Sequence, residues 1–241
     1  MPKFLTFLIL VSHWSFGQVL QNGLILPTAA NTENSCCIYS PEVGFTVYEN
    51  PRGLIVGKLT RDVSKNQSDQ SAYEIYFVDI STKTKTKLDL VNFREVDYEI
   101  WSITYFERRD GFVRVVNENS NYWLNEAEIQ KLGFAVVEWQ AFLSNSKNLM
   151  GFYANDPGLN LREGPTKEAR IIKTLRGDLY EISPTNEHNG LWTKVKIVKR
   201  KEHPCETTLT EKDNIEYELE GWIKIVDDSG QPNVGYNARG C

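Results

Sequence analysis

Two stretches of the chain share one pattern of apolar and polar positions. Residues 44–59 and 158–175 each begin with glycine, alternate apolar and polar side chains, turn at a proline and return with an apolar run. The turns fall at Pro51 and Pro165. Because alternation with a period of two places successive side chains on opposite faces of a strand, each stretch predicts a β-hairpin.

The second hairpin distributes its side chains between two faces. Leu159 and Leu161 share one face, and Asn160 and Arg162 share the other. The leucines can enter a core, and we expect the polar pair to stabilise turns and to pack across the strand. A further turn is expected at Gly177, followed by a separate short strand.

The similarity between the two halves continues along the chain. Residues 108–116 resemble 187–198, because both have a glycine turn, an aromatic residue and then alternating apolar and basic positions. Residues 121–125 match 220–225, and each carries Trp followed by an aliphatic residue. The first half has a longer insertion, residues 62–99. Three matching blocks in one order predict two small all-β units, barrels or sandwiches.

Two short helices are predicted between the units. Asn125 and Glu128 resemble a capping box at the start of residues 126–133, and Gly133 can end that helix. Residues 138–147 carry apolar side chains at positions i, i+3 and i+4, which indicates a second helix.

Composition and charge narrow the possible partners. The chain has 241 residues, of which 41% are hydrophobic, with a formal net charge of −5. No basic excess is available for a phosphate backbone, so nucleic-acid binding is not expected. The basic run at residues 194–201 is interpreted as a strand that ends in a solvated loop.

The N-terminus resembles an export signal. A basic residue precedes the apolar run Phe4–Val11, and Ser15 and Gly17 are the small residues of a cleavage site that would release residues 1–17. The apolar run is too short to span a membrane, and stable membrane insertion is not expected. We therefore expect an exported protein in the periplasm, at the cell surface or outside the cell.

An exported protein can keep disulfides, and the chain has four cysteines. A bond between the neighbours Cys36 and Cys37 would be strained, and the role of these two residues is left open. We expect Cys205 in a polar loop to pair with the terminal Cys241. A zinc site is the rival interpretation, but no Cys-x-x-Cys motif is present, and neither a metal nor a cofactor is expected.

The last third of the chain resembles a bacterial SH3-like (SH3b) domain. In that family a Gly-Leu-Asn-hydrophobic-Arg-x-x-Pro segment opens the barrel, a Trp-x-Lys-Val strand follows, and a Gly-Trp-hydrophobic strand closes it. The matching segments here are Gly158–Arg162, Pro165, Ile171–Leu175, Gly177, Trp192–Val195 and Gly221–Ile223. In the first unit Thr46 and Tyr48 replace the Asn and Arg, so that unit is a divergent copy.

The resemblance implies a mainly β fold, with two small SH3-like β-barrels in tandem joined by a short helical linker. Residues 1–17 are the signal peptide, 18–40 an N-terminal tail, 41–135 the divergent unit, 136–155 the linker and 156–241 the SH3b domain. The layout as a whole resembles exported proteins of Bacteroidetes-type bacteria.

The resemblance implies binding, with a protein or a peptidoglycan peptide as the partner. Aromatic side chains are the usual means of peptide capture. In the second unit the candidate binding residues are Tyr180, Trp192, Tyr217 and Trp222, with Asn160 and Arg162. We expect the two tryptophans to belong to the core, whereas the two tyrosines are expected either at the surface or in the core. In the first unit the aromatic candidates are Tyr48, Tyr105, Tyr122 and Trp123.

Nothing in the sequence predicts an enzyme. The chain has no Gly-x-Ser-x-Gly elbow and no His-Glu-x-x-His helix, and His188 and His203 belong to no catalytic motif. Two alternatives stay open. One is a structural or interaction protein without a small ligand, and the other is a cell-wall hydrolase of unrecognised type. The sequence does not indicate the oligomeric state.

Overall fold

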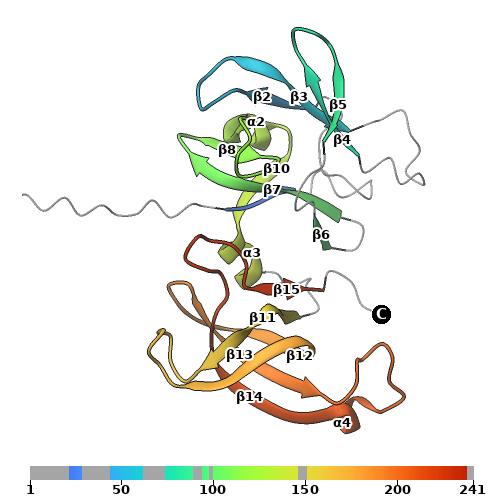
Figure 1. The fold of residues 1–241 in the computed structure, drawn as a ribbon, viewed down its shortest axis with the longest axis vertical. Helices are drawn as coiled ribbons and strands as arrows, with labels where there is room; N and C mark the ends of the chain where they lie inside the picture. The colour runs from blue at the N-terminus through green and yellow to red at the C-terminus, as the bar shows by residue number, and fades with distance from the viewer. Residues whose placement is uncertain are drawn as a thin grey trace, which may run out of the picture.

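The computed structural model describes residues 22–28, 44–61, 74–88, 94–97, 100–145 and 151–237. These residues form a ten-stranded and a five-stranded β-sheet together with three short helices. Figure 1 shows the two sheets one above the other, with helix α3 between them. The expectation of a mainly β chain is therefore confirmed.

The upper sheet, here called the first unit, has the strand order β10-β1-β7-β8-β9-β2-β3-β4-β5, and β6 pairs with β7. All of its pairings are antiparallel. Its elements are β1 (Gly23–Pro27), β2 (Phe45–Tyr48), β3 (Ile55–Arg61), β4 (Ile75–Asp79), β5 (Lys85–Leu88), β6 (Arg94–Asp97), β7 (Ile100–Arg109), β8 (Phe112–Val115), β9 (Trp123–Asn125), α2 (Glu126–Lys131) and β10 (Phe134–Glu138).

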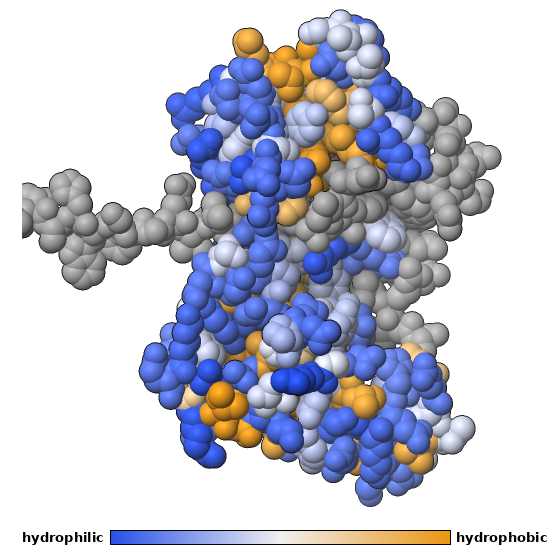
Figure 2. Space-filling model, viewed as in Figure 1, coloured by the Kyte–Doolittle hydropathy of each residue, from blue (hydrophilic) through white to orange (hydrophobic). Residues whose placement is uncertain are grey.

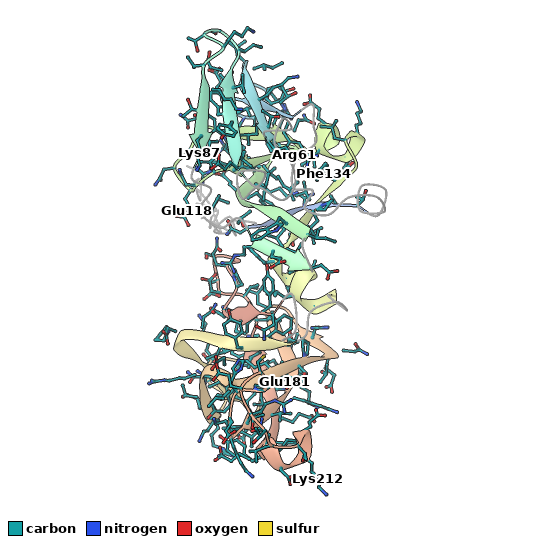
Figure 3. All side chains as sticks on the ribbon, turned by 90° about the vertical axis from the view of Figure 1, so that its right-hand side faces the viewer. Arg61, Lys87, Glu118, Phe134, Glu181 and Lys212 are labelled. Atoms are coloured by element: carbon teal, nitrogen blue, oxygen red, sulfur yellow. The ribbon has the colours of Figure 1, made fainter. Side chains whose placement is uncertain are left out.

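The hairpin predicted at residues 44–59 is formed by β2 and β3, with Phe45 opposite Leu59. Both side chains are buried, and the Phe45 ring meets the Phe134 ring edge-on with centroids 5.1 Å apart. Phe134, labelled in Figure 3, lies inside the upper unit. The alternation thus places one face of each strand in a common core.

Helix α2 begins where the capping pattern predicts it. The Asn125 side chain accepts hydrogen bonds from the backbone N–H groups of Ala127 and Glu128, at 2.9 and 3.2 Å. Gly133 follows the helix with φ +80°. The short helix is thus closed at both ends by its own local sequence.

Strand β1 lies inside the segment that the sequence analysis assigned to a tail, so the chain departs from that assignment. It pairs with both β7 and β10, and Leu24 and Ile25 are fully buried. Gly23 permits this position, because an added Cβ would lie 2.7 Å from the Tyr105 ring. The apolar run within residues 23–27 was too short to be recognised as a strand without its partner strands.

The lower sheet, here called the second unit, has the order β12-β13-β14-β11-β15, and β12 also pairs with β11. Its elements are β11 (Phe152–Arg162), β12 (Ile171–Asn189), β13 (Trp192–Arg200), α4 (Glu211–Asn214), β14 (Ile215–Lys224) and β15 (Val234–Tyr236). The hairpin predicted at residues 158–175 is formed by β11 and β12.

Strand β12 corrects the prediction of a turn at Gly177 followed by a separate strand. The strand runs through Gly177, which has φ +74°. Its first part pairs with β11, and its second part, from Tyr180 onward, pairs with β13. A glycine accommodates the local bend that lets one strand serve two neighbours.

The predicted helical linker, residues 136–155, is helical only in α3 (Trp139–Asn145). Its start belongs to β10 and its end to β11. Trp139 and Phe142 pack against Tyr236 of β15, with ring centroids 6.4 and 5.6 Å away. Leu24 of the first unit belongs to the same buried cluster. The two units are therefore joined by a packed core.

Several sequence predictions concern residues outside the described ranges. These are the signal peptide and the three cysteines Cys36, Cys37 and Cys241. Across the ranges that the structure does describe, no helix combines the length and the hydrophobicity needed to cross a membrane.

Candidate functional site

Strand β14 places Trp222 at the centre of a row of side chains. Trp222 lies opposite Arg162 of β11 on one side and opposite Lys194 of β13 on the other. Directly opposed residues of antiparallel strands project from the same face of a sheet. Trp192 lies two residues before Lys194 and therefore on this same face.

The face that carries these tryptophans points away from the core. Thr193, Val195 and Ile223 are fully buried, and they alternate with Trp192 and Trp222, which are partly exposed. Neither indole belongs to the hydrophobic cluster of the second unit. The expectation that both tryptophans lie in the core is therefore wrong. We call this surface the Trp192–Trp222 face.

Ion pairs border the tryptophans on β13. The Lys194 ammonium lies 2.7 Å from the Glu220 carboxylate and 2.9 Å from that of Glu187. Hydrogen bonds to these two carboxylates raise the pKa of Lys194. The ammonium is thus held beside Trp222, and the aromatic surface lies within an ordered polar border.

A second ion-pair group lies at the end of β14. Lys224, opposite Trp192, pairs with Asp228, and Lys167 lies 2.7 Å from the same carboxylate. Hydrogen bonds from Lys167 and Lys224 lower the pKa of Asp228 to about 2. Sequence reasoning did not assign these charged neighbours to the site, because only the strand register shows that they adjoin the tryptophans.

Asn160 and Arg162 are engaged within the protein. The Arg162 guanidinium donates to the carbonyl of Ala169 at 2.7 Å, across the hairpin. The Asn160 side-chain oxygen accepts from the Thr174 hydroxyl at 2.8 Å. Both contacts agree with the structural role expected of these residues. Arg162 also forms part of the row that contains Trp222.

The two candidate tyrosines form a separate pair. Their hydroxyl groups lie 3.1 Å apart, and Lys199 lies between them in the strand register. The hydrogen bond with Tyr217 and burial raise the pKa of Tyr180. By the alternation of their strands, Tyr180 and Tyr217 both project toward the core and not toward the outward face. Tyr180 belongs to the buried cluster of the second unit. The structure therefore does not unite the four aromatic candidates on one surface.

The first unit has a row of opposed side chains that resembles the row around Trp222. Trp123 of β9 lies opposite Arg114 of β8 and opposite Tyr48 of β2. Here the indole is only 3% exposed. The guanidinium groups of Arg109 and Arg114 cover it, at 4.8 and 5.7 Å from the ring, and Glu107 bridges both. The two units thus share a register, but only the second leaves its tryptophan partly exposed.

The remaining aromatic candidates of the first unit are also occupied. The Tyr48 hydroxyl donates to Glu128 at 2.6 Å, and Tyr105 is fully buried. The Tyr122 ring stacks on Phe77 with centroids 4.7 Å apart. These side chains serve packing and hydrogen bonding inside the unit.

The histidines have local partners. His188 Nδ1 lies 3.2 Å from the Thr193 hydroxyl, and His203 lies 3.8 Å from the Asp178 carboxylate. The Cys205 backbone N–H donates to His203 Nδ1 at 3.3 Å, within one turn. Within the described ranges, no three His, Cys, Asp or Glu side chains gather as a metal ion would require.

Comparison with models of known protein families, with curated proteins and with solved structures finds no match to this chain.

Proposed function

We propose that this protein is an exported, non-catalytic binding module that captures a protein or a cell-wall peptide on the Trp192–Trp222 face. The observation that carries the proposal is the partial exposure of two neighbouring indoles on the outward side of one sheet. Tryptophan supplies a large, rigid contact surface and is enriched among the residues that dominate binding energy.

The charged border supports the same proposal. Lys194 and Glu220 hold each other beside the tryptophans, so their side chains are already ordered before a partner arrives. Aromatic anchors with a polar border are typical of protein and peptide interfaces. In the first unit, Arg109 and Arg114 already cover Trp123, and the partly exposed Trp101 packs against the core of that unit. Binding is therefore assigned to the second unit.

The pairing pattern favours an SH3-like barrel in the second unit. Hydrogen-bonded pairs run from β12 to β13, β14 and β11, and from β11 back to β12. A bent strand that pairs with two neighbours is one way to close a small sheet on itself. We propose a second, divergent SH3-like unit in the first sheet, where β3 and β7 take the places of the two parts of β12.

The experiment uses residues 18–241, purified and mixed with intact peptidoglycan, which is then sedimented. Wild type is expected in the pellet, and Trp192→Ala with Trp222→Ala is expected to weaken binding by about tenfold or more. Trp101→Ala is the matched control, because it removes a partly buried tryptophan from the other unit. We expect the control to bind within about twofold of wild type.

Two results would each overturn part of the proposal. Wild type that stays in the supernatant at every salt concentration excludes the cell-wall partner. A double variant that keeps its circular-dichroism spectrum and sediments like wild type excludes the tryptophan face.

The proposal includes export and a disulfide between Cys205 and Cys241. Such a bond would tie the chain end to the loop between β13 and β14, which suits an oxidising compartment. Mass mapping of peptides without reductant should recover the two cysteines in one linked pair. Free thiols at both positions would show that the pairing is wrong.

A further inference from the structure

Three large aliphatic side chains are exposed at one end of the first unit. Leu54, Ile55 and Ile80 are 74%, 46% and 47% exposed. Leu54 lies in the turn after β2, Ile55 is the first residue of β3, and Ile80 lies in the turn after β4. The Ile80 N–H donates to the carbonyl of Val56 at 3.0 Å, which places Ile80 beside the start of β3. We call Leu54, Ile55 and Ile80 the aliphatic tip.

The concentration of apolar surface at this tip is unusual for this chain. Among the described residues, five large hydrophobic side chains are exposed, and the other two, Ile171 and Leu209, belong to the second unit. Figure 2 shows hydrophobic residues reaching the surface in the upper part of the molecule, over strands β2 to β4. Contiguous exposed apolar residues with a polar border commonly mark an interaction surface.

The elements that carry the tip are basic, although the chain as a whole is acidic. In their described residues, 44–61 and 74–88, six basic side chains face three acidic ones, Glu49, Glu74 and Asp79. The chain carries a net charge of −5. Lys87, labelled in Figure 3, lies on β5 of this region. The basic residues are Arg52, Lys58, Arg61, Lys83, Lys85 and Lys87.

Two of these basic residues belong to the turns of the tip itself. Arg52 lies two residues before Leu54, and Lys83 three residues after Ile80. Both have positive φ, 65° and 60°, in the two turns. The same turns also hold acids, because Glu49 accepts a hydrogen bond from the Leu54 N–H and Asp79 directly precedes Ile80. The excess of positive charge therefore comes from the basic side chains of the adjoining strands β3 and β5.

We propose that the aliphatic tip docks on the surface of a lipid membrane that carries anionic headgroups. Leu54, Ile55 and Ile80 enter the headgroup boundary, and the basic residues around them are attracted to the lipid phosphates. Charge complementarity favours an anionic membrane over a second copy of this chain as the partner of the tip. A second copy of the tip would bring two positive surfaces together, whereas an anionic bilayer offers both negative charge and an apolar interior.

The experiment sediments residues 18–241 with vesicles of phosphatidylglycerol and phosphatidylcholine, or of phosphatidylcholine alone. We expect binding to the anionic vesicles only, and a loss of about tenfold or more when salt rises from about 0.05 M to about 0.5 M. Leu54→Ser with Ile80→Ser is expected to reduce binding by about tenfold or more. Lys83→Gln is expected to weaken it by several-fold.

The control is Ile171→Ser with Leu209→Ser, which removes exposed aliphatic groups of comparable exposure, 44% and 39%, from the second unit. It should bind anionic vesicles within about twofold of wild type. Equal binding to neutral vesicles, or unchanged binding by the tip variant, would overturn the proposal. A dimer in sedimentation velocity that the tip substitutions dissociate, without vesicle binding, would assign the tip to a second copy.

The Trp192→Ala, Trp222→Ala variant separates this proposal from the proposed function, because it leaves the first unit intact. It is expected to keep vesicle binding while it loses peptidoglycan.

Discussion

The glycine of the closing Gly-Trp segment has a specific steric role, and its replacement is the sharpest test of the second unit. In Gly221→Ala, the new Cβ would lie 2.7 Å from the Arg162 carbonyl oxygen and 2.9 Å from Leu161 Cγ. The first of these neighbours is backbone and cannot rotate away, so β14 must move from β11. Such overpacking costs about 2 kcal/mol. For a chain of this length that unfolds in one transition, that lowers Tm by roughly 4–8 °C.

The assay is thermal unfolding followed by near-ultraviolet circular dichroism, which reports the packing of the aromatic residues. Gly164→Ala is the control in the same unit, since its Cβ would meet only Ala169, at an ordinary 3.6 Å. We expect the control to unfold within a few degrees of wild type. If the two variants share one Tm, the close approach of β14 to β11 is wrong.

Three further predictions test the first unit and its junction with the second. Asn125→Ala removes the cap of α2 and should lower the free energy of unfolding by about 1 kcal/mol in urea titrations, with unchanged m-value. The hydrogen bond to Glu128, together with burial, raises the pKa of Tyr48 to about 12 from 10.0. As the pH rises, the Tyr48 hydroxyl therefore loses its proton in the unfolded state before it does in the folded state. The stabilisation that comes from the protonated hydroxyl is complete below pH 10 and is lost between pH 10 and 12. Tyr48→Phe should flatten that part of the pH–stability curve. Phe142→Ala removes a ring that packs on Tyr236 and should cost about 3 kcal/mol, with calorimetry showing two transitions where wild type shows one.

The hairpins were predictable because alternation is a local property of the chain. The Leu-x-Leu pattern at residues 159–161 placed both leucines on the buried side of β11, where they are 8% and 0% exposed. Asn125 likewise predicted the start of α2, because a helix cap depends only on the residues next to it.

The sequence already contained a pattern that indicates on which face of the sheet Trp192 lies. In the segment Trp192–Ile197, the residues Val195 and Ile197 alternate with lysines, so the parity of the strand puts Trp192 on the lysine side. The expectation of a core position followed from the size and hydrophobicity of tryptophan and was wrong. For an isolated strand, alternation was the better guide than residue type.

The sequence by itself determined which side chains share a face, because the period of a strand is set by the backbone. Only the tertiary structure decided which strands meet: that β1 enters the first sheet between β10 and β7, and that β12 serves two neighbours. It also decided the difference between the two tryptophan rows. Trp123 is covered because Arg109 and Arg114 reach it, whereas Trp222 stays partly exposed. Exposure depends on contacts between distant residues, which no local pattern contains.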